Sequence, residues 1–204
     1  MNLHRARILV PAAGRPFVDG DALDHRAPLV WTVPDLLDRA ECAAQIARID
    51  ALGPTAAPIT TARGPVMDPG VRNNERVIID DPALAALLDA RLGDAAPASL
   101  AGLVRCGANE RLRCYRYRPG QRFAPHHDGA FVRNPDERSL LTLIVYLNDD
   151  MTGGHTDFAL GVSVAPRTGT ALLFQHALLH EGCPVIAGVK YVLRSDVMYR
   201  RPPR

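Results

Sequence analysis

The chain has 204 residues, of which 47% are hydrophobic and 23% are charged, so it can bury a full hydrophobic core as one domain. Its formal net charge of +2 is too small to argue for a nucleic-acid partner, and no apolar run approaches the length of a membrane span. We therefore expect a single domain over residues 1–204 that binds neither nucleic acid nor a membrane, with an oligomeric state that the sequence leaves open.

The cysteines Cys42, Cys106, Cys114 and Cys183 are widely scattered and include no C-x-x-C pair. In a chain of this size this pattern favours buried thiols over a disulfide framework. No charged and then apolar signal peptide opens the chain. These features predict a reducing compartment, with the cytoplasm as the default location.

The first third of the chain predicts one strand and one helix. Residues 1–27 show no clear period and are expected to be a partly ordered lead-in, whereas residues 28–33 have the composition of a strand. Residues 38–52 carry apolar or small residues at helical spacing. Asp38 and Glu41 are placed as a capping box, which marks the start of this helix.

A second helix is predicted further along. Residues 54–70 are rich in Pro, Gly, Thr and Ala and are expected to form a loop. Asp80 or Asp81 then caps a helix over residues 82–92, which carries leucines on one stripe. Residues 1–109 are therefore predicted to be mostly helical support and loops.

From residue 110 onward the hydrophobic period changes from helical to two, which is typical of strands. The predicted strands cover residues 111–117, 140–147, 155–160, 170–175 and 190–199. Short strands after a helical first half predict an α+β fold. Its catalytic core, over residues 110–204, is expected to be a double-stranded β-helix (jelly roll) with supporting N-terminal helices.

A metal site is the main functional prediction. The tripeptide H-x-D occurs twice, as His126-x-Asp128 and His155-x-Asp157. In a jelly roll the third ligand comes from a distant strand, and the 54 positions from His126 to His180 leave room for three strands, whereas the 25 from His155 do not. His126 and Asp128, two positions apart, share one face of an extended segment. Two imidazoles and one carboxylate are the ligand set of a mononuclear non-haem iron(II) oxygenase.

Two other histidines compete for these roles. His176 competes with His180 as the third ligand, and His127 competes with His126. Lys190 favours His180, because a cation ten positions later would balance the far carboxylate of a chelating 2-oxo acid. His127 points to the opposite face of its segment, so a surface or supporting role is expected. The alternative for the whole set is a jelly roll whose histidines only satisfy hydrogen bonds.

Four sequence blocks, in order along the chain, carry a family resemblance. They are LRCYRYRPGQRFAPHHD at residues 112–128, LIVYLND at 143–149, GGHTDF at 153–158, and HEGCPV with GVKY within 180–191. Together they resemble the prolyl-4-hydroxylase branch of the iron(II)/2-oxoglutarate dioxygenases. The resemblance extends over residues 72–199.

The resemblance implies that His126, Asp128 and His180 ligate catalytic iron. It implies a salt bridge from Lys190 to the distal (C5) carboxylate of 2-oxoglutarate. It also implies that the hydroxyls of two tyrosines, Tyr117 and Tyr146, reach the co-substrate. The implied cofactors are Fe(II), 2-oxoglutarate and O₂, with ascorbate considered as a reductant.

Strand alternation predicts several charged residues inside the fold. The strand of Lys190 places Arg194 and Asp196 on its inner face, and the strand of Tyr117 does the same for Arg113 and Tyr115. Buried charges are costly unless they are paired or bound. Either these charges satisfy one another, or Arg113, Tyr115 and Asp196 contact a polar substrate. Arg194 could also help to hold 2-oxoglutarate.

These features predict a dioxygenase that hydroxylates an unactivated C–H bond and releases succinate and CO₂. A peptidyl substrate, such as a prolyl residue, would need an open groove, with residues 54–70 and 129–139 as its walls. A small polar molecule would suit an enclosed pocket lined by the inward-facing charges. The alternative from a different class is a non-catalytic jelly-roll protein that binds a metal or a sugar.

Overall fold

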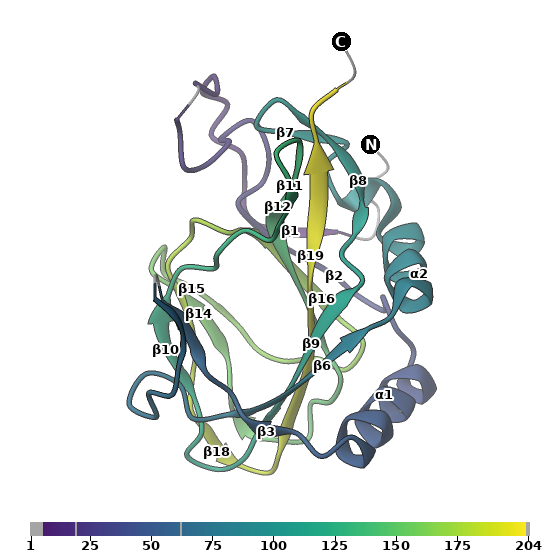
Figure 1. The fold of residues 1–204 in the computed structure, drawn as a ribbon, viewed down its shortest axis with the longest axis vertical. Coiled ribbons are helices and arrows are strands. Elements are labelled where there is room, and N and C mark those ends of the chain that lie inside the picture. Colours follow the sequence, from purple (N-terminus) through teal and green to yellow (C-terminus); the bar gives the residue numbers. More distant parts are fainter. Residues whose placement is uncertain (1–5, 19, 62, 203–204) are drawn as a thin grey trace.

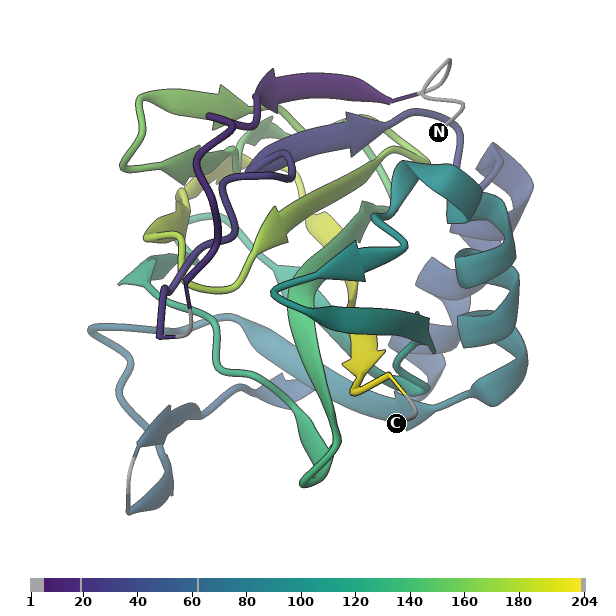
Figure 2. The ribbon, with the colours of Figure 1, turned by 90° about the horizontal axis from the view of Figure 1, so that it is seen from above.

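In the computed structural model, which describes residues 6–18, 20–61 and 63–202, the chain forms three layers. Two helices cover one face of a large β-sheet, and a smaller sheet lies against the other face (Figures 1 and 2). The helices are α1 (Arg39–Ala51) and α2 (Pro82–Leu92), followed by a 3₁₀ turn at Gly93–Ala95.

The strands are short, apart from two long ones in the second half of the chain. They are β1 (Arg7–Val10), β2 (Val30–Val33), β3 (Thr55–Ala56), β4 (Ile59–Thr61), β5 (Gly64–Val66), β6 (Glu75–Asp80), β7 (Ser99–Leu100), β8 (Leu103–Ala108), β9 (Arg111–Tyr117), β10 (Phe123–His126), β11 (Val132–Asn134), β12 (Glu137–Tyr146), β13 (Thr152–Gly153), β14 (Thr156–Phe158), β15 (Val162–Val164), β16 (Ala171–Gln175), β17 (His180–Gly182), β18 (Val185–Ala187) and β19 (Lys190–Arg200). The bounds of β9 are those predicted, and the ends of β2, β12, β14, β16 and β19 lie within three residues of the predicted ones.

Both helices lie where the sequence predicts them, because their N-terminal N–H groups find side-chain acceptors. At α1 the Asp38 carboxylate accepts from the Glu41 N–H, and the Glu41 carboxylate accepts from the Asp38 N–H, both at 2.8 Å. At α2 the Asp81 carboxylate accepts from the Leu84 N–H at 2.9 Å, and Pro82 occupies the first turn. Neither helix in the described part of the chain combines the length and apolarity needed to cross a membrane.

The first half of the chain is nevertheless not mostly helical, and that prediction is wrong. Its helices have only 13 and 11 residues, whereas β1, β2, β3, β6 and β8 all join the large sheet. Residues 54–70, predicted to be a loop, carry β3, β4 and β5, and the β4–β5 hairpin stands away from the body of the fold (Figure 2). Pairing with neighbouring strands stabilises these segments as strands even where their own hydrophobic alternation is weak. The result is a mostly-β fold with few helices.

The large sheet has 11 strands, with β1-β2-β16-β12-β19-β9-β6-β3 as its main path. The long strand β19 lies near its centre and pairs antiparallel with β12, β9 and β8 (Figure 1). The small sheet has the order β10-β17-β14-β15. Within residues 112–199, the strands of the large sheet thus face those of the small sheet across a shared interior.

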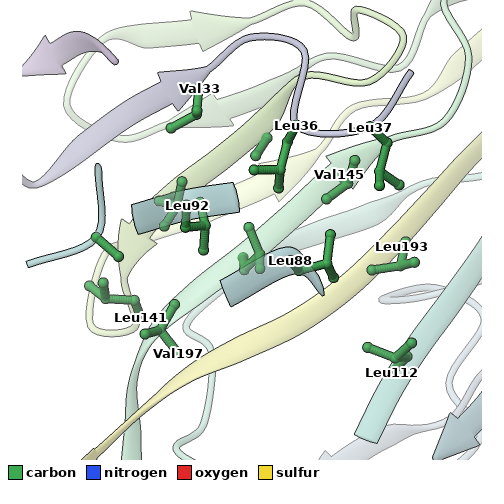
Figure 3. Packing of buried hydrophobic residues seen from close by; sticks show 14 of the residues in the cluster. Val33, Leu36, Leu37, Leu88, Leu92, Leu112, Leu141, Val145, Leu193 and Val197 are labelled. Carbon is green, nitrogen blue, oxygen red and sulfur yellow. The ribbon is translucent and has the colours of Figure 1, made fainter. Parts of the chain in front are cut away.

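Two hydrophobic clusters hold the layers together. Between the helices and the large sheet, Leu88 and Leu92 of α2 pack among side chains such as Leu141 and Val197 (Figure 3). Between the two sheets, aromatic side chains predominate, including the edge-to-face pair of Phe158 and Phe174, whose ring centroids are 5.0 Å apart. The four cysteines carry free thiols; Cys42 and Cys114 are buried and the other two are half-buried.

Leu88 anchors α2 to the sheet, and its truncation tests this packing. Its side chain is fully buried, whereas that of Leu87 on the same helix is 37% exposed. We expect Leu88→Ala to lower the free energy of unfolding by about 2–5 kcal/mol, because it removes buried methyl groups and leaves a cavity. Leu87→Ala should cost less than about 1 kcal/mol. Urea unfolding of the two variants measures the difference, and equal losses would show that α2 does not pack as described.

Candidate active site

His126 and His180 meet because β10 and β17 pair antiparallel, with these two residues directly opposite each other. A register irregularity between Phe123 and His126 sets this pairing. The two imidazole centroids lie 4.3 Å apart. The ring of Phe123 stacks on that of His126 at 3.5 Å, and Phe174 lies edge-on to His180 at 4.5 Å. Aromatic packing therefore fixes both imidazoles on the inner face of the small sheet.

Each imidazole is held in the tautomer that a metal requires. His126 donates from Nδ1 to the carbonyl of Ala124 at 2.8 Å, and His180 donates from Nδ1 to the carbonyl of Leu178 at 3.0 Å. The Nε2 lone pair of each ring then remains available. Burial lowers the pKa of His126 to about 4 and also lowers the pKa of His180. Both rings are thus neutral donors at neutral pH.

Asp128 follows β10 and lies between the two sheets, where three groups position it. Its backbone N–H donates to the carbonyl of His176 at 3.2 Å, and the Thr142 hydroxyl donates to Oδ2 at 2.5 Å. Arg194 Nη2 lies 3.2 Å from Oδ1. Burial alone would raise the pKa of Asp128, but Arg194, His180 and Thr142 outweigh it and hold that pKa below its usual range.

The three side chains fit a single metal ion. Nε2 of His126 lies 3.8 Å from Oδ1 of Asp128, and Nε2 of His180 lies 3.7 Å from Oδ2. Bonds of about 2.1 Å, usual for imidazole and a divalent metal, allow donors up to about 4.2 Å apart to share one ion. All three donors lie within 4.8 Å of one another, and in the described part of the chain no fourth His, Cys, Asp or Glu joins this group. Two imidazoles and one carboxylate with open positions suit iron(II).

The competing histidines have other roles. His127 is exposed, and its Nδ1 bonds the carbonyl of Ala177 at 3.0 Å. His176 is buried, with Nε2 2.7 Å from the Ser139 hydroxyl and Nδ1 2.9 Å from the Thr142 hydroxyl. Because Thr142 donates to Asp128, its oxygen accepts the proton of His176 Nδ1, and Nε2 accepts from Ser139. His176 therefore supports Asp128 through Thr142, which sequence reasoning missed.

A cavity extends from these three side chains toward Lys190. Its lining includes Tyr117 and Tyr146, as strand alternation predicts, together with Thr156. The Tyr146 hydroxyl lies 2.8 Å from the Thr156 hydroxyl, and burial raises the pKa of both tyrosines. The apolar side chain of Ile144 also lines the cavity. Thr156 was not predicted, although it lies in the third of the four sequence blocks.

Lys190 is a buried cation at the far end of this cavity. It is 3% exposed, and Nζ donates to the carbonyl of Gly154 at 2.5 Å. Its Nζ lies 5.3 and 5.5 Å from the ring centroids of Tyr117 and Tyr146. Among the described residues no carboxylate lies within ion-pairing distance of it. Burial lowers the pKa of Lys190 to about 8. The described residues therefore offer this cation no negatively charged partner in the cavity.

The Gly153-Gly154 turn closes over Lys190, and both residues have positive φ angles, +79° and +70°. A Cβ on Gly153 would lie 2.6 Å from the carbonyl oxygen of Pro184, and one on Gly154 would lie 3.1 Å from Cδ of Lys190. Only glycine allows this close approach without displacement of the backbone. The GG pair of the third sequence block therefore shapes the cavity.

The buried charge of Lys190 predicts a pH-dependent stability. Its pKa is about 8 in the fold against 10.5 in the unfolded chain, so between these values the unfolded chain binds more protons and stability rises with pH. Lys190→Met has no such group. We expect the metal-free, co-substrate-free Met variant to be more stable at pH 7.5, with the difference shrinking by about 3 kcal/mol as the pH rises to 10.5. Denaturant unfolding at several pH values measures this, and a constant difference would contradict a buried charge.

Arg113, Arg194 and Asp196 form an ion-pair network beside the metal side chains. Arg113 Nη1 donates to Oδ2 of Asp196 at 2.9 Å, and Arg194 Nη2 lies 3.1 Å from Oδ1 of Asp196. Asp196 is fully buried and is enclosed by the two arginines, so these contacts lend no support to its prediction as a direct substrate contact. Tyr115 and Arg113, in contrast, both line open space next to Asp128.

Two open grooves reach Asp128 from outside. One, of about 470 Å³, runs from the β4–β5 hairpin past Arg113 and Tyr115. The other, of about 880 Å³, runs along Phe17, residues 20–22, Asp24 and the start of β12. Both are lined by His127, Asp128 and Ala130. Asp128, with His126 beside it in the first groove, therefore lies at the base of a trench formed by the two grooves, whereas His180 lines the inner cavity.

Comparisons with known proteins agree with this geometry. Residues 112–195 match the family model of the 2OG-Fe(II) oxygenase superfamily. A putative prolyl 4-hydroxylase of Acanthamoeba polyphaga mimivirus is 33% identical over 103 residues, covering 41% of this chain and 42% of the relative. Prolyl 4-hydroxylase 1 of Arabidopsis thaliana is 32% identical over 108 residues, covering 40% and 38%. The chain thus spans about two fifths of the length of these curated relatives.

Solved structures share the fold. A viral collagen prolyl hydroxylase from Paramecium Bursaria Chlorella virus-1, solved with 2OG, matches with a TM-score of 0.60 at 21% identity, over 90% of this chain and 99% of the other. A prolyl hydroxylase of Trichoplax adhaerens, solved with a peptide fragment of hypoxia inducible factor, matches with 0.66 at 18% identity, over 82% of each chain.

The four sequence blocks, the converging His–Asp–His group and the family match all concern the same segment of the chain. Proteins of this family use Fe(II), 2-oxoglutarate and O₂. Residues 112–195 are therefore similar to the 2OG-Fe(II) oxygenase superfamily, and the curated relatives that match this part of the chain are prolyl 4-hydroxylases.

Proposed function

We propose that this protein is an Fe(II)- and 2-oxoglutarate-dependent hydroxylase whose iron is held by His126, Asp128 and His180. The observation that carries the proposal is that one cavity has this three-donor group at one end and at the other a buried cation, Lys190, with no carboxylate partner among the described residues. When bound, iron and 2-oxoglutarate supply O₂ activation for C–H hydroxylation, with release of succinate and CO₂.

The roles of the residues follow from their contacts. His126 and His180 present Nε2, because their Nδ1 protons are committed to backbone carbonyls. Lys190 supplies the counter-charge for the distal carboxylate of 2-oxoglutarate. Tyr117 and Tyr146 offer hydroxyl groups along the cavity between the metal donors and Lys190. The buried walls exclude water from the reacting atoms.

Arg194 is less suited than Lys190 to hold the distal carboxylate. Its guanidinium is already paired with Asp128 and Asp196, next to the metal donors, at 3.2 and 3.1 Å. Lys190 lies four residues away on the same strand and has no carboxylate partner within the described residues. A co-substrate that chelates the metal and extends across the cavity would therefore end at Lys190.

We infer that the two facing sheets form a double-stranded β-helix, and that residues 1–204 act as one domain. The small sheet contributes β10, β14, β15 and β17, and the large sheet contributes β9, β12, β16 and β19. The metal donors come from β10, from the residues after it, and from β17, all at one end of the shared interior. The strands of the first half extend the large sheet, and the helices pack on its outer face.

The open trench favours a substrate that extends on both sides of the metal, such as a peptide segment. The relatives named prolyl 4-hydroxylases and the structural neighbour solved with a peptide support a peptidyl substrate. Ile59 and Thr60 of β4 line one groove together with Gly129 and Ala130, and these residues belong to the two segments that a peptidyl groove would use as walls. The arginines at its base would suit a small polar acid as well.

The experiment that tests the proposal is O₂-dependent conversion of 2-oxoglutarate to succinate by iron-loaded protein, first without an added primary substrate. We expect slow succinate formation that requires both Fe(II) and O₂ and stops when a chelator removes the metal. A non-catalytic metal- or sugar-binding protein would form no succinate under any of these conditions, and that result would reject the proposal.

A further inference from the structure

The inner face of the large sheet carries an excess of positive charge beside the metal donors. Arg76, Arg113 and Arg194 lie on adjacent strands β6, β9 and β19; Arg113 is the direct partner of Arg194, and Arg76 is the direct partner of Tyr115. Tyr115 lines the groove, so Arg76 shares its face. No ion pair of Arg76 is found among the described residues, and burial lowers its pKa.

Arg72 adds a further buried cation to this face. It is 5% exposed, and its guanidinium lies over the rings of Tyr115 and Phe123, at 4.5 and 4.3 Å from their centroids. Nε donates to the Asn74 side chain at 2.7 Å, but Nη2 is buried with no hydrogen-bond partner in the described structure. A buried guanidinium with an unused donor is costly unless something binds to it or near it.

Arg194 also has an unused donor. It is 7% exposed and lines both the cavity and the groove of about 470 Å³, yet its Nε is buried without a partner. Its anionic neighbours are Asp128, which would bind the metal, and Asp196, which also forms an ion pair with Arg113. With Asp128 bound to metal, a single carboxylate is left for two arginines.

The groove contains no other acid that could balance them. Asp128 is the one carboxylate among the described residues that line it, whereas Arg113 and Arg194 both do. A planar guanidinium matches a carboxylate, which accepts two parallel hydrogen bonds from its fork of N–H groups.

We propose that this groove binds a carboxylate of the primary substrate through Arg113, with Arg194 beside it, and thereby presents a neighbouring C–H bond to the metal. This inference rests on the proposed function and names its substrate class: a free carboxylic acid, or the acidic side chain or C-terminus of a peptide. The carboxylate is the shared chemistry of these sources.

The test compares matched acids and amides as primary substrates. One arm uses N-acetyl amino acids against their amides, and the other uses end-capped heptapeptides with Asp against the same peptides with Asn. Succinate formation is measured above the rate without substrate. We expect the acid of at least one pair to stimulate or competitively inhibit turnover and its neutral partner to do neither. The arm that responds identifies the source of the carboxylate.

The variant Arg113→Gln separates binding from folding. We expect KM for the responding acid to rise roughly 10- to 100-fold, since a charge-assisted hydrogen-bond pair is lost, with a smaller change in kcat. Arg113→Lys should recover part of the affinity. The matched control is Arg118→Gln, just beyond the same strand and 51% exposed, which should behave like wild type.

The outcomes distinguish this inference from the proposed function. The wild-type protein could form succinate without substrate and yet respond equally to acids and amides, or to neither. That result would overturn the carboxylate site and leave the proposed hydroxylase function intact. An unchanged KM in Arg113→Gln, or a response only to phosphorylated peptides run in parallel, would overturn it too. Absence of any succinate formation would instead reject the proposed function.

Discussion

Replacing Asp128 with alanine is expected to abolish both iron binding and succinate formation. Asp128 is the single carboxylate of the donor group, and without it two neutral imidazoles remain next to the positive charge of Arg194. The loss should exceed the 10- to 100-fold effect typical of removing a residue that only supports a ligand. Isothermal titration with Fe(II) under anaerobic conditions and a succinate assay measure the two effects.

The control for this variant is Asp157→Ala. Asp157 belongs to the second H-x-D tripeptide and to the group Asp157, Glu181 and Cys183, the other set of donors that the described structure brings within 4.8 Å. We expect this variant to bind iron and form succinate as wild type does. Wild-type turnover by Asp128→Ala, or loss of iron in Asp157→Ala alone, would move the metal site to the second group.

Replacing Lys190 with methionine should weaken 2-oxoglutarate binding while it stabilises the metal-free protein near neutral pH. The cation is buried and bonds one carbonyl, so its removal relieves a desolvation cost in the empty cavity. With 2-oxoglutarate present, the same change removes a charge-assisted contact of about 1–3 kcal/mol, or roughly a 5- to 150-fold loss of affinity. Thermal unfolding and the dependence of turnover on 2-oxoglutarate concentration measure the two opposite effects.

The opposite signs make this prediction specific. A residue that only supports the fold would lose stability and affinity together. If co-substrate affinity is unchanged in Lys190→Met, the distal carboxylate must be held by another cation, and Arg194 is the next candidate on the same face. Arg167→Met, a variant in the turn before β16, provides the control and should change neither quantity.

The strands of the catalytic half could be predicted from sequence because their alternation reflects burial on one face. β9 and β19 present Lys190, Arg113 and Arg194 to one interior, as period-two reasoning requires. The helices could be predicted because Asp38 and Asp81 cap them locally. These signals are short-range, and each can be read from a few neighbouring residues.

The missed features depend on contacts between distant segments. β6 is a strand because it pairs with β9, and its own alternation is weak. The support of Asp128 by Thr142 and His176 joins segments 14 and 34 residues apart, and no local pattern encodes it. Arg72 stacks between Tyr115 and Phe123 from a segment predicted to precede the core. Only the assembled sheets bring these groups together.

The three donor residues were predicted by composition and spacing, but their convergence depends on register. His126 and His180 are opposite partners only because of the irregularity in β10 after Phe123. A shift by one residue would turn one imidazole to the outer face. The trench beside Asp128 depends in turn on the β4–β5 hairpin, within residues predicted to be a loop.

The central claim is that one ferrous ion is shared by side chains from β10, β17 and the segment between them, with co-substrate reaching toward β19. A crystal structure of the protein with Fe(II) and 2-oxoglutarate, obtained without oxygen, tests it most directly. We predict metal bonds of about 2.1 Å to Nε2 of His126, Nε2 of His180 and the Asp128 carboxylate, with Lys190 Nζ bonded to the distal carboxylate. A metal bound elsewhere, or a fourth protein ligand closing the coordination sphere, would contradict the account.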